Sequence, residues 1–115
     1  MKNIDLSPEA LNDLRRIKAY ITAEYGENSA QKIVGSIMDS IDNLRIFPDI
    51  GTSIFERYGI ECDYLHVVSN HNYIFYRNEG ESVRVIRVLN ERQDFMYTLF
   101  GITTTTQETE DYWDE

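Results

Sequence analysis

The spacing of apolar residues along the chain changes near Pro48. Before this residue, apolar side chains recur every three or four positions in two runs, which is typical of helices that bury one face. Ser7 and Pro8 give the first run a start signal, and Gly26 gives it an end. We predict two helices, near residues 8–25 and 29–46, and the short break between them predicts an antiparallel helical hairpin.

Beyond Pro48, apolar and polar residues alternate, which is the pattern of strands that bury one face of a sheet. We predict strands at 64–69, 73–78 and 82–90, the last two joined by a turn that contains Gly80. The change of period predicts that the second half of the chain forms a sheet.

Three shorter segments complete the pattern. We predict a short, weak first strand at residues 2–6. We predict a short strand or a loop at 54–58, and a short helix or an edge segment at 95–100. The element order β-α-α-β-β-β predicts an α+β domain, in which the N-terminal helical hairpin packs on one face of an antiparallel sheet. We place this domain at residues 1–101 and a flexible acidic tail at 102–115, where no period is sustained.

Length and composition agree with one domain. A chain of 115 residues with 42% hydrophobic content can bury one core. No apolar run approaches the roughly 18 residues of a membrane span, and the N-terminus lacks the apolar block of a secretory signal. We expect a cytoplasmic protein, in which the single Cys62 is a half-buried hydrophobic residue with no disulfide partner.

The net charge of −9 is concentrated at the C-terminus. Residues 1–107 hold 15 acidic and 11 basic residues, a net −4, and "QETEDYWDE" at 107–115 adds five carboxylates. A domain of net −4 is a poor electrostatic partner for nucleic acid unless its bases cluster on one face. Two hypotheses stay open for the tail: it is solvated chain, or it covers a basic strip between residues 77 and 92, with Tyr112 and Trp113 as a docking segment.

Three segments, taken in order, resemble one known family. They are "LSPEALNDLRRIKAYI" near the N-terminus, "IDNLRIFPDIG" in the middle, and "NYIFYRNEGESVRVIRVLNERQDF" before the tail. This ordered set, over residues 3–100, resembles the RelE/ParE superfamily of toxins from bacterial type II toxin–antitoxin systems. Many ParE-like members end the last strand with His-Glu-Arg-x-Asp, and residues 90–94 match this motif except for Asn90 in place of the His.

The resemblance to the RNA-cleaving branch is weaker. That branch implies cleavage of mRNA on the ribosome, which needs a base near the 2′-OH, cations at the phosphate and an acid at the leaving oxygen. Tyr73 stands where such relatives commonly have an Arg, and Asn90, where a His often stands, cannot transfer a proton. If the protein is a nuclease, the candidate catalytic residues are Arg87, Arg92 and Tyr97; otherwise none is favoured.

The candidate residues for binding a target or an antitoxin cluster near the last two strands and the turn after them. An arginine among apolar strand residues also fits an ion pair with a carboxylate, and Asp94 equally fits the N-cap of a last helix. Strict alternation places Arg87 on the face of Val83, Val85 and Leu89. The full candidate set is Arg77, Arg84, Arg87, Glu91, Arg92, Asp94 and Phe95.

We expect no metal and no cofactor, because neither His66 nor His71 has a second ligand at suitable spacing. The favoured function is a ParE-like toxin that inhibits DNA gyrase by protein–protein contact. The alternatives are a ribosome-dependent mRNA endonuclease like RelE and a non-toxic relative kept as a binding module. The resemblance implies a small antitoxin that wraps the helical hairpin and the sheet, with oligomerisation through that antitoxin.

Overall fold

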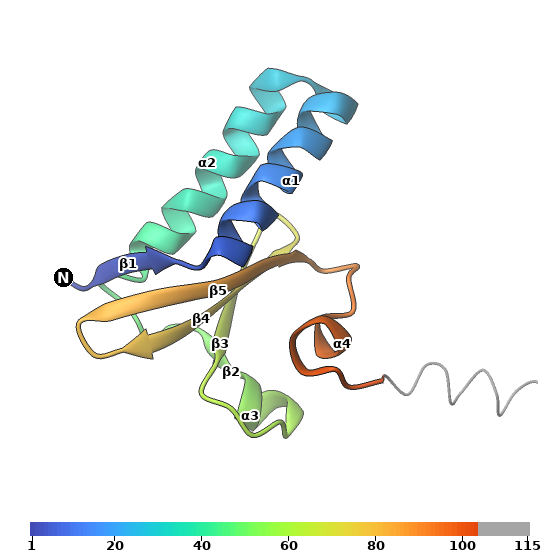
Figure 1. The fold of residues 1–115 in the computed structure, drawn as a ribbon. Helices are drawn as coiled ribbons and strands as arrows, with labels where there is room; N and C mark the ends of the chain where they lie inside the picture. Colours follow the sequence, from blue (N-terminus) through green and yellow to red (C-terminus); the bar gives the residue numbers. More distant parts are fainter. Residues whose placement is uncertain (104–115) are drawn as a thin grey trace, which may run out of the picture.

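The computed structural model describes residues 1–103 and places a helical hairpin against a five-stranded sheet (Figure 1). The expected flexible tail lies outside the described residues from 104 onward. The described elements are β1 (Asn3–Leu6), α1 (Pro8–Tyr25), α2 (Glu27–Asn43), β2 (Thr52–Ser53), α3 (Ile54–Tyr58), β3 (Leu65–Ser69), β4 (Asn72–Glu79), β5 (Ser82–Asn90) and α4 (Phe95–Phe100).

Local signals explain the hairpin. The Ser7 Oγ accepts a hydrogen bond from the Ala10 N–H at 2.9 Å and so caps α1. Gly26, at φ +93°, separates α1 from α2 with a backbone conformation that other residues rarely adopt. The predicted helical hairpin is confirmed, although α2 begins two residues before and ends three residues before the predicted 29–46.

The sheet has the strand order β1-β5-β4-β3-β2. The three long strands β3, β4 and β5 pair antiparallel, as predicted. The prediction of an antiparallel sheet needs one correction, because β1 pairs parallel with β5, in register from Asn3 with Ser82 to Leu6 with Val85. A parallel pair requires a long crossover, and both helices and the other strands lie between these two segments. The sheet is therefore mixed.

A β-bulge in β5 changes which residues face the helices. Phe75 pairs with Arg87 but the next residue of β4, Tyr76, pairs with Val85, so Ile86 has no partner in β4. Val85 and Val88 both join the helix-facing core as a result. Arg87 pairs with Phe75, so its side chain leaves β5 on the face away from the helical hairpin. Its guanidinium still reaches Asp13 of α1. The prediction that Arg87 shares a face with Val85 was wrong because strict alternation ends at the bulge.

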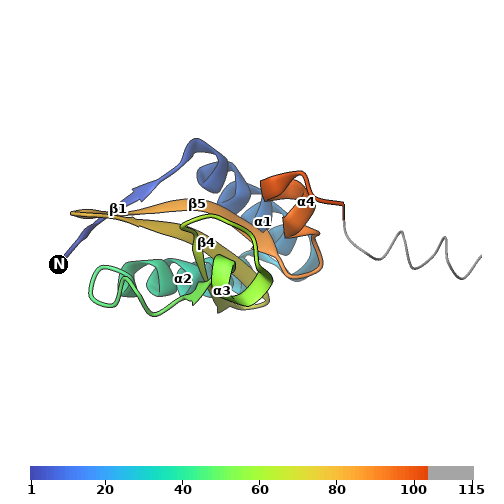
Figure 2. The ribbon, with the colours of Figure 1, turned by 90° about the horizontal axis from the view of Figure 1, so that it is seen from below.

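Each face of the sheet carries its own core. The hairpin side buries Leu14, Ile37 and Ile41 against the sheet. On the other side, α3 and α4 lie below the sheet in Figure 1, and viewed from below α4 lies beside the end of β5 (Figure 2). Their residues Tyr58 and Phe95 pack against a second cluster of buried residues, Ile54, Phe75 and Leu89.

The two short segments with open predictions are both helical. Residues 54–58, expected as a strand or a loop, form α3, because Ser53 caps it by accepting the Glu56 N–H at 3.2 Å. Residues 95–100 form the helix α4, one of the two alternatives. Cys62 is half-buried, as predicted. Within residues 1–103, no helix is long and apolar enough to cross a membrane.

Candidate functional site

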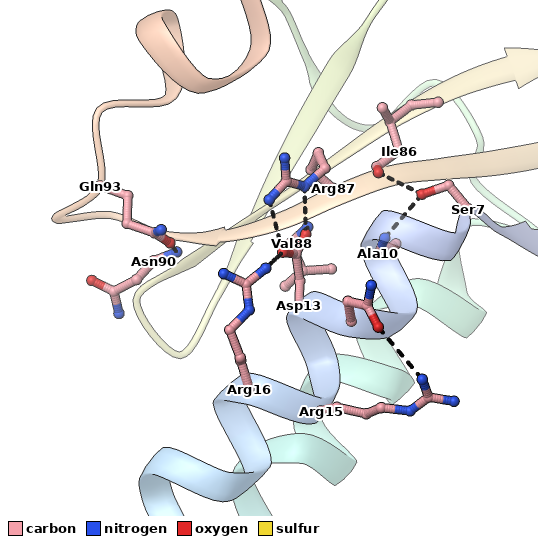
Figure 3. Close-up of polar contacts among 11 residues, drawn as sticks. Ser7, Ala10, Asp13, Arg15, Arg16, Ile86, Arg87, Val88, Asn90 and Gln93 are labelled. Carbon is pink, nitrogen blue, oxygen red and sulfur yellow. Dashed lines mark hydrogen bonds and ion pairs between the residues drawn. The ribbon is translucent and has the colours of Figure 1, made fainter.

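The edge of β5 is completed by the start of α1 rather than by a strand. β1 pairs with β5 only as far as Val85. Beyond it, the Ser7 N–H donates to the Val85 carbonyl at 3.0 Å and the Ser7 hydroxyl donates to the Ile86 carbonyl at 2.6 Å. The carboxylate of Asp13 then accepts the Val88 N–H at 2.9 Å (Figure 3). Ser7, the N-cap of α1, and the Asp13 side chain thus satisfy backbone groups that a neighbouring strand would otherwise bind.

Asp13 also neutralises the predicted site residue Arg87. The Arg87 Nε lies 2.7 Å from one carboxylate oxygen and its Nη2 lies 2.9 Å from the other. This hydrogen-bonded pairing raises the pKa of Arg87 above its ordinary value. Arg16 contacts the same carboxylate at 2.9 Å, and Asp13 itself is only 3% exposed. The guanidinium of Arg87 is therefore committed to holding α1 on the sheet.

The other two strand arginines are paired as well. Arg77 donates to Glu79 at 2.7 Å through Nε and lies 3.9 Å from Asp63. Its bond to Glu79 raises the pKa of Arg77. Arg84 pairs with Asp5 on β1. All three strand arginines of the candidate set therefore form ion pairs with carboxylates of the same chain.

The polar residues 90–94 form the turn that ends the sheet. The Asn90 side chain accepts the Arg92 N–H at 2.9 Å, and the Gln93 side chain accepts the Asn90 N–H at 3.0 Å. Asp94 caps α4 by accepting the Tyr97 N–H at 3.3 Å, so the cap alternative for Asp94 is confirmed. Glu91 lies 2.8 Å from the Nδ1 of His71. Asn90 therefore holds the backbone of this turn.

The three candidate nuclease residues do not form a cluster. Arg87 is bound to α1, Arg92 is exposed in the turn, and Tyr97 is 65% exposed on α4. No hydrogen bond or ion pair among residues 1–103 joins any two of them. Phe95 is partly buried, and the centroid of its ring lies 5.1 Å from those of both Tyr58 and Phe75.

The histidines have structural surroundings. His66 is buried among aromatic rings, and its Nε2 lies 3.1 Å from the Tyr58 hydroxyl. Burial lowers the pKa of His66 below 6.5, because the charged imidazolium is poorly solvated there. His71 is exposed beside Glu91. Across the described part of the chain, no group of three His, Cys, Asp or Glu residues is placed to hold a metal ion.

A cleft of about 540 Å³ lies between the helical hairpin and the turns at one end of the sheet. Tyr20 and Tyr25, on the half of α1 that projects beyond the sheet, line it and are 61% and 68% exposed. Glu91 and Arg92 also line it, so two of the predicted binding residues lie at this site. The remaining lining residues are Asp13, Arg16, Ile17, Ile21, Ile33, Asn70, His71, Asn72, Val88, Asn90 and Gln93.

Sequence reasoning missed the two tyrosines, because Tyr25 continues the apolar stripe of α1 and fits a core position, and Tyr20 was assigned to no site. No local signal marks them, because their exposure depends on how far α1, an 18-residue helix, projects beyond the sheet (Figure 1).

The family of the chain follows from comparison with known proteins. The model of the ParE toxin of type II toxin–antitoxin systems, parDE, matches residues 4–95. The chain belongs to the ParE toxin family. Among solved structures, the ParE-family chain is similar to one from the chromosomal ParDE toxin–antitoxin system of P. aeruginosa, with a TM-score of 0.65 and 16% identity. That match covers 78% of this chain and 96% of the other.

The structural similarity extends the family assignment to the fold. At 16% identity it establishes a shared backbone arrangement, and the assignment of the toxin domain rests on the family match. A search among curated proteins found no match. This ParE-family protein is therefore a toxin domain of a type II toxin–antitoxin system, with a helical hairpin, a mixed sheet and a tyrosine-lined cleft between them.

Proposed function

We propose that this ParE-family toxin acts in the cytoplasm by binding DNA gyrase, and not by cutting RNA. The observation that carries the proposal is the pairing of Arg77, Arg84 and Arg87 with carboxylates of the same chain. RNA cleavage needs free cations beside a proton donor and acceptor. A toxin that acts by protein–protein contact needs neither.

The same proposal includes a cognate antitoxin that occupies the cleft. Tyr20 and Tyr25 are large, exposed and amphipathic, and such side chains are enriched at the centres of protein interfaces. An amphipathic helix of the antitoxin can lay its apolar side between them, and its polar side can contact Arg16 and Arg92. Antitoxins that dimerise would then bring two toxins into one assembly.

The experiment compares DNA synthesis with protein synthesis after the toxin gene is induced. Pulse labelling is expected to show DNA synthesis stopping first, and the purified protein is expected to inhibit supercoiling by gyrase. The variants Arg92→Ala and Tyr97→Phe are expected to retain this toxicity, because the proposal gives neither residue a proton to transfer.

The alternatives predict different outcomes of the same experiment. Protein synthesis that stops first, with mRNA cut on translating ribosomes, would replace the gyrase proposal with the ribosome-dependent nuclease. If neither process changes and the chain still binds its antitoxin, the non-toxic binding module is the correct description. In the nuclease outcome, loss of cleavage in Arg92→Ala would indicate that Arg92 contacts the phosphate of the bound RNA.

A further inference from the structure

We propose that residues 104–115 bind into the cleft of their own chain when no partner is present. The occupant is thus the C-terminal segment "TTTQETEDYWDE", which lies outside the described residues. The inference goes beyond the proposed function, because it holds whichever cellular target the toxin has.

The cleft offers apolar surface beside exposed positive charge. Ile17, Ile21 and Ile33 line it together with the two tyrosines. Of its charged residues, Arg16 is 69% exposed and Arg92 is exposed, while Asp13 is buried and already bound by Arg87. No carboxylate of residues 1–103 forms an ion pair with Arg92. The mouth of the cleft is therefore suited to an acidic segment that carries a large apolar side chain.

The C-terminal segment has that composition. Tyr112 and Trp113 are adjacent, and the five carboxylates of residues 107–115 surround them without any Lys or Arg. An indole or phenol ring between Tyr20 and Tyr25 gains aromatic contacts worth about 0.5–1.5 kcal/mol beyond its area burial. The neighbouring carboxylates can form a bidentate hydrogen-bonded pair with Arg92 and a further contact with Arg16, whose Nη2 already binds Asp13.

The net negative charge of residues 1–103 repels an acidic segment, but charges near the cleft act on it more strongly than charges far away. These residues carry −4, from 15 acids and 11 bases. At physiological ionic strength the Debye length is about 8 Å, so exposed carboxylates on the far side of the domain contribute little. The cleft itself is lined by Arg16 and Arg92 and by Asp13 and Glu91, and Arg87 binds Asp13, so these five formal charges sum to +1.

The chain between the cleft and Trp113 is long enough for Trp113 to return to the cleft. Gln93 lines the cleft, and α4 begins two residues later and adds a helix of only about 9 Å before the segment starts. Residues 104–113 can span at most about 35 Å when extended. A short tether gives a local concentration on the order of millimolar, so a contact with a Kd of about 0.1 mM would be about nine-tenths formed.

The functional consequence is competition. An antitoxin segment that enters the cleft must displace the C-terminal segment, and removing residues 104–115 is expected to raise the affinity for that antitoxin by about tenfold under the occupancy given above. This change in affinity rests on the proposed antitoxin site, whereas the binding of residues 104–115 rests on the cleft alone and does not depend on the gyrase proposal.

Trp113 is the single tryptophan of the chain and gives a direct test. We expect its emission in the full chain to be shifted to shorter wavelength, and its quenching by acrylamide to be several-fold weaker, relative to a synthetic peptide of residues 104–115. The variant Arg92→Glu is expected to restore peptide-like quenching. The matched control Arg15→Glu makes the same charge change on α1 outside the cleft and is expected to leave Trp113 protected.

Three results would overturn the inference. Emission and quenching identical to those of the peptide would show that the segment stays in solvent. Protection that disappears on dilution would show that it binds a second copy of the chain instead. A variant with Tyr20→Ala and Tyr25→Ala provides an independent check, because protection that survives both substitutions would place the segment elsewhere.

Discussion

Arg87 on β5 binds Asp13 on α1 through two hydrogen bonds, of 2.7 Å and 2.9 Å, across 74 positions of sequence. The same carboxylate accepts the Val88 N–H, at the part of β5 that β1 leaves uncovered. One side chain therefore fixes the helix, satisfies the edge of the strand and neutralises an arginine. The stability of the domain should depend on it more than on any surface ion pair.

Replacing Asp13 by Ala is expected to lower the free energy of unfolding by about 3 kcal/mol. The substitution leaves Arg87, which is only 19% exposed, without its counter-charge and leaves the Val88 N–H without an acceptor. Urea unfolding followed by circular dichroism measures the change.

Arg16→Ala is the control, because Arg16 contacts the same carboxylate from a largely exposed position. An exposed pair of this kind is worth about 0–1 kcal/mol. If Asp13→Ala costs no more than Arg16→Ala, then the Asp13 carboxylate does not support the edge of β5.

Gly51→Ala is expected to destabilise the protein by about 1–3 kcal/mol, the usual range for overpacking. A Cβ at this position would lie 2.6 Å from the Tyr76 hydroxyl and 2.9 Å from the His66 carbonyl oxygen. The Gly51 N–H donates to that same hydroxyl at 2.9 Å, so the ring of Tyr76 cannot move away without losing this bond. Thermal unfolding gives the measurement.

Gly35→Ala is the matched control for Gly51→Ala. Gly35 lies within α2, and a Cβ there would have nothing within 4 Å. Alanine is favoured over glycine inside a helix by up to about 1 kcal/mol, so this variant should be more stable than the parent chain. Equal effects of the two substitutions would contradict the close approach of Gly51 to Tyr76.

The protein is expected to lose stability as the pH falls below 6.5, through His66. Burial lowers the pKa of this imidazole from 6.5, so the folded chain keeps it neutral while the unfolded chain takes up a proton. The stability that the neutral imidazole of His66 contributes is fully present above pH 6.5. It is lost as the pH falls through 6.5 toward the lower pKa of the folded state. Urea unfolding between pH 8 and pH 5.5 measures it.

Two variants assign this pH dependence to one residue. His66→Phe is expected to flatten the dependence between pH 5.5 and 8 even if it changes the absolute stability. His71→Gln is expected to retain it, because His71 is 80% exposed. A dependence that persists in His66→Phe would mean that another group titrates.

Binding of the antitoxin is expected to weaken by about 30-fold, or 2 kcal/mol, when Tyr20 and Tyr25 are both replaced by Ala. The reason is that both line the cleft. Tyr97→Ala provides a control with the same residue type and a similar exposure, 65%, on α4 away from the cleft. Titration calorimetry with the purified antitoxin gives the affinities; equal losses for the two variants would remove the cleft as the binding site.

Local sequence signals were sufficient for most elements of the fold. Ser7 and Pro8 start α1, Gly26 ends it, and the change of period after Pro48 marks the sheet. These features act over a few residues, so they can be read without knowing which segments meet. The parallel pairing of β1 with β5 joins segments that are nearly 80 residues apart, and no local pattern records such a choice of neighbour.

The site was harder to predict than the fold for the same reason. The bulge at Ile86 turns Arg87 to the other face of the sheet, and a period of two cannot reveal a single inserted residue. Asp13 gave no signal as the partner of Arg87, since it is one of many carboxylates on helix α1 and elsewhere. Glu91 and Arg92, which were predicted from their motif, line the cleft, whereas the cleft itself depends on how far α1 projects past the sheet.

The pairing of the first strand with the last sets an order of events during folding. The helical hairpin and the β4–β5 hairpin consist of contacts between near neighbours in sequence, which form fastest. β1 has no partner until Val85 has been synthesised, so a ribosome must translate most of the domain before its first strand can dock. During folding, the amides of Asn3–Leu6 should therefore be the last in the sheet to become protected from hydrogen exchange, although they are the first to be synthesised.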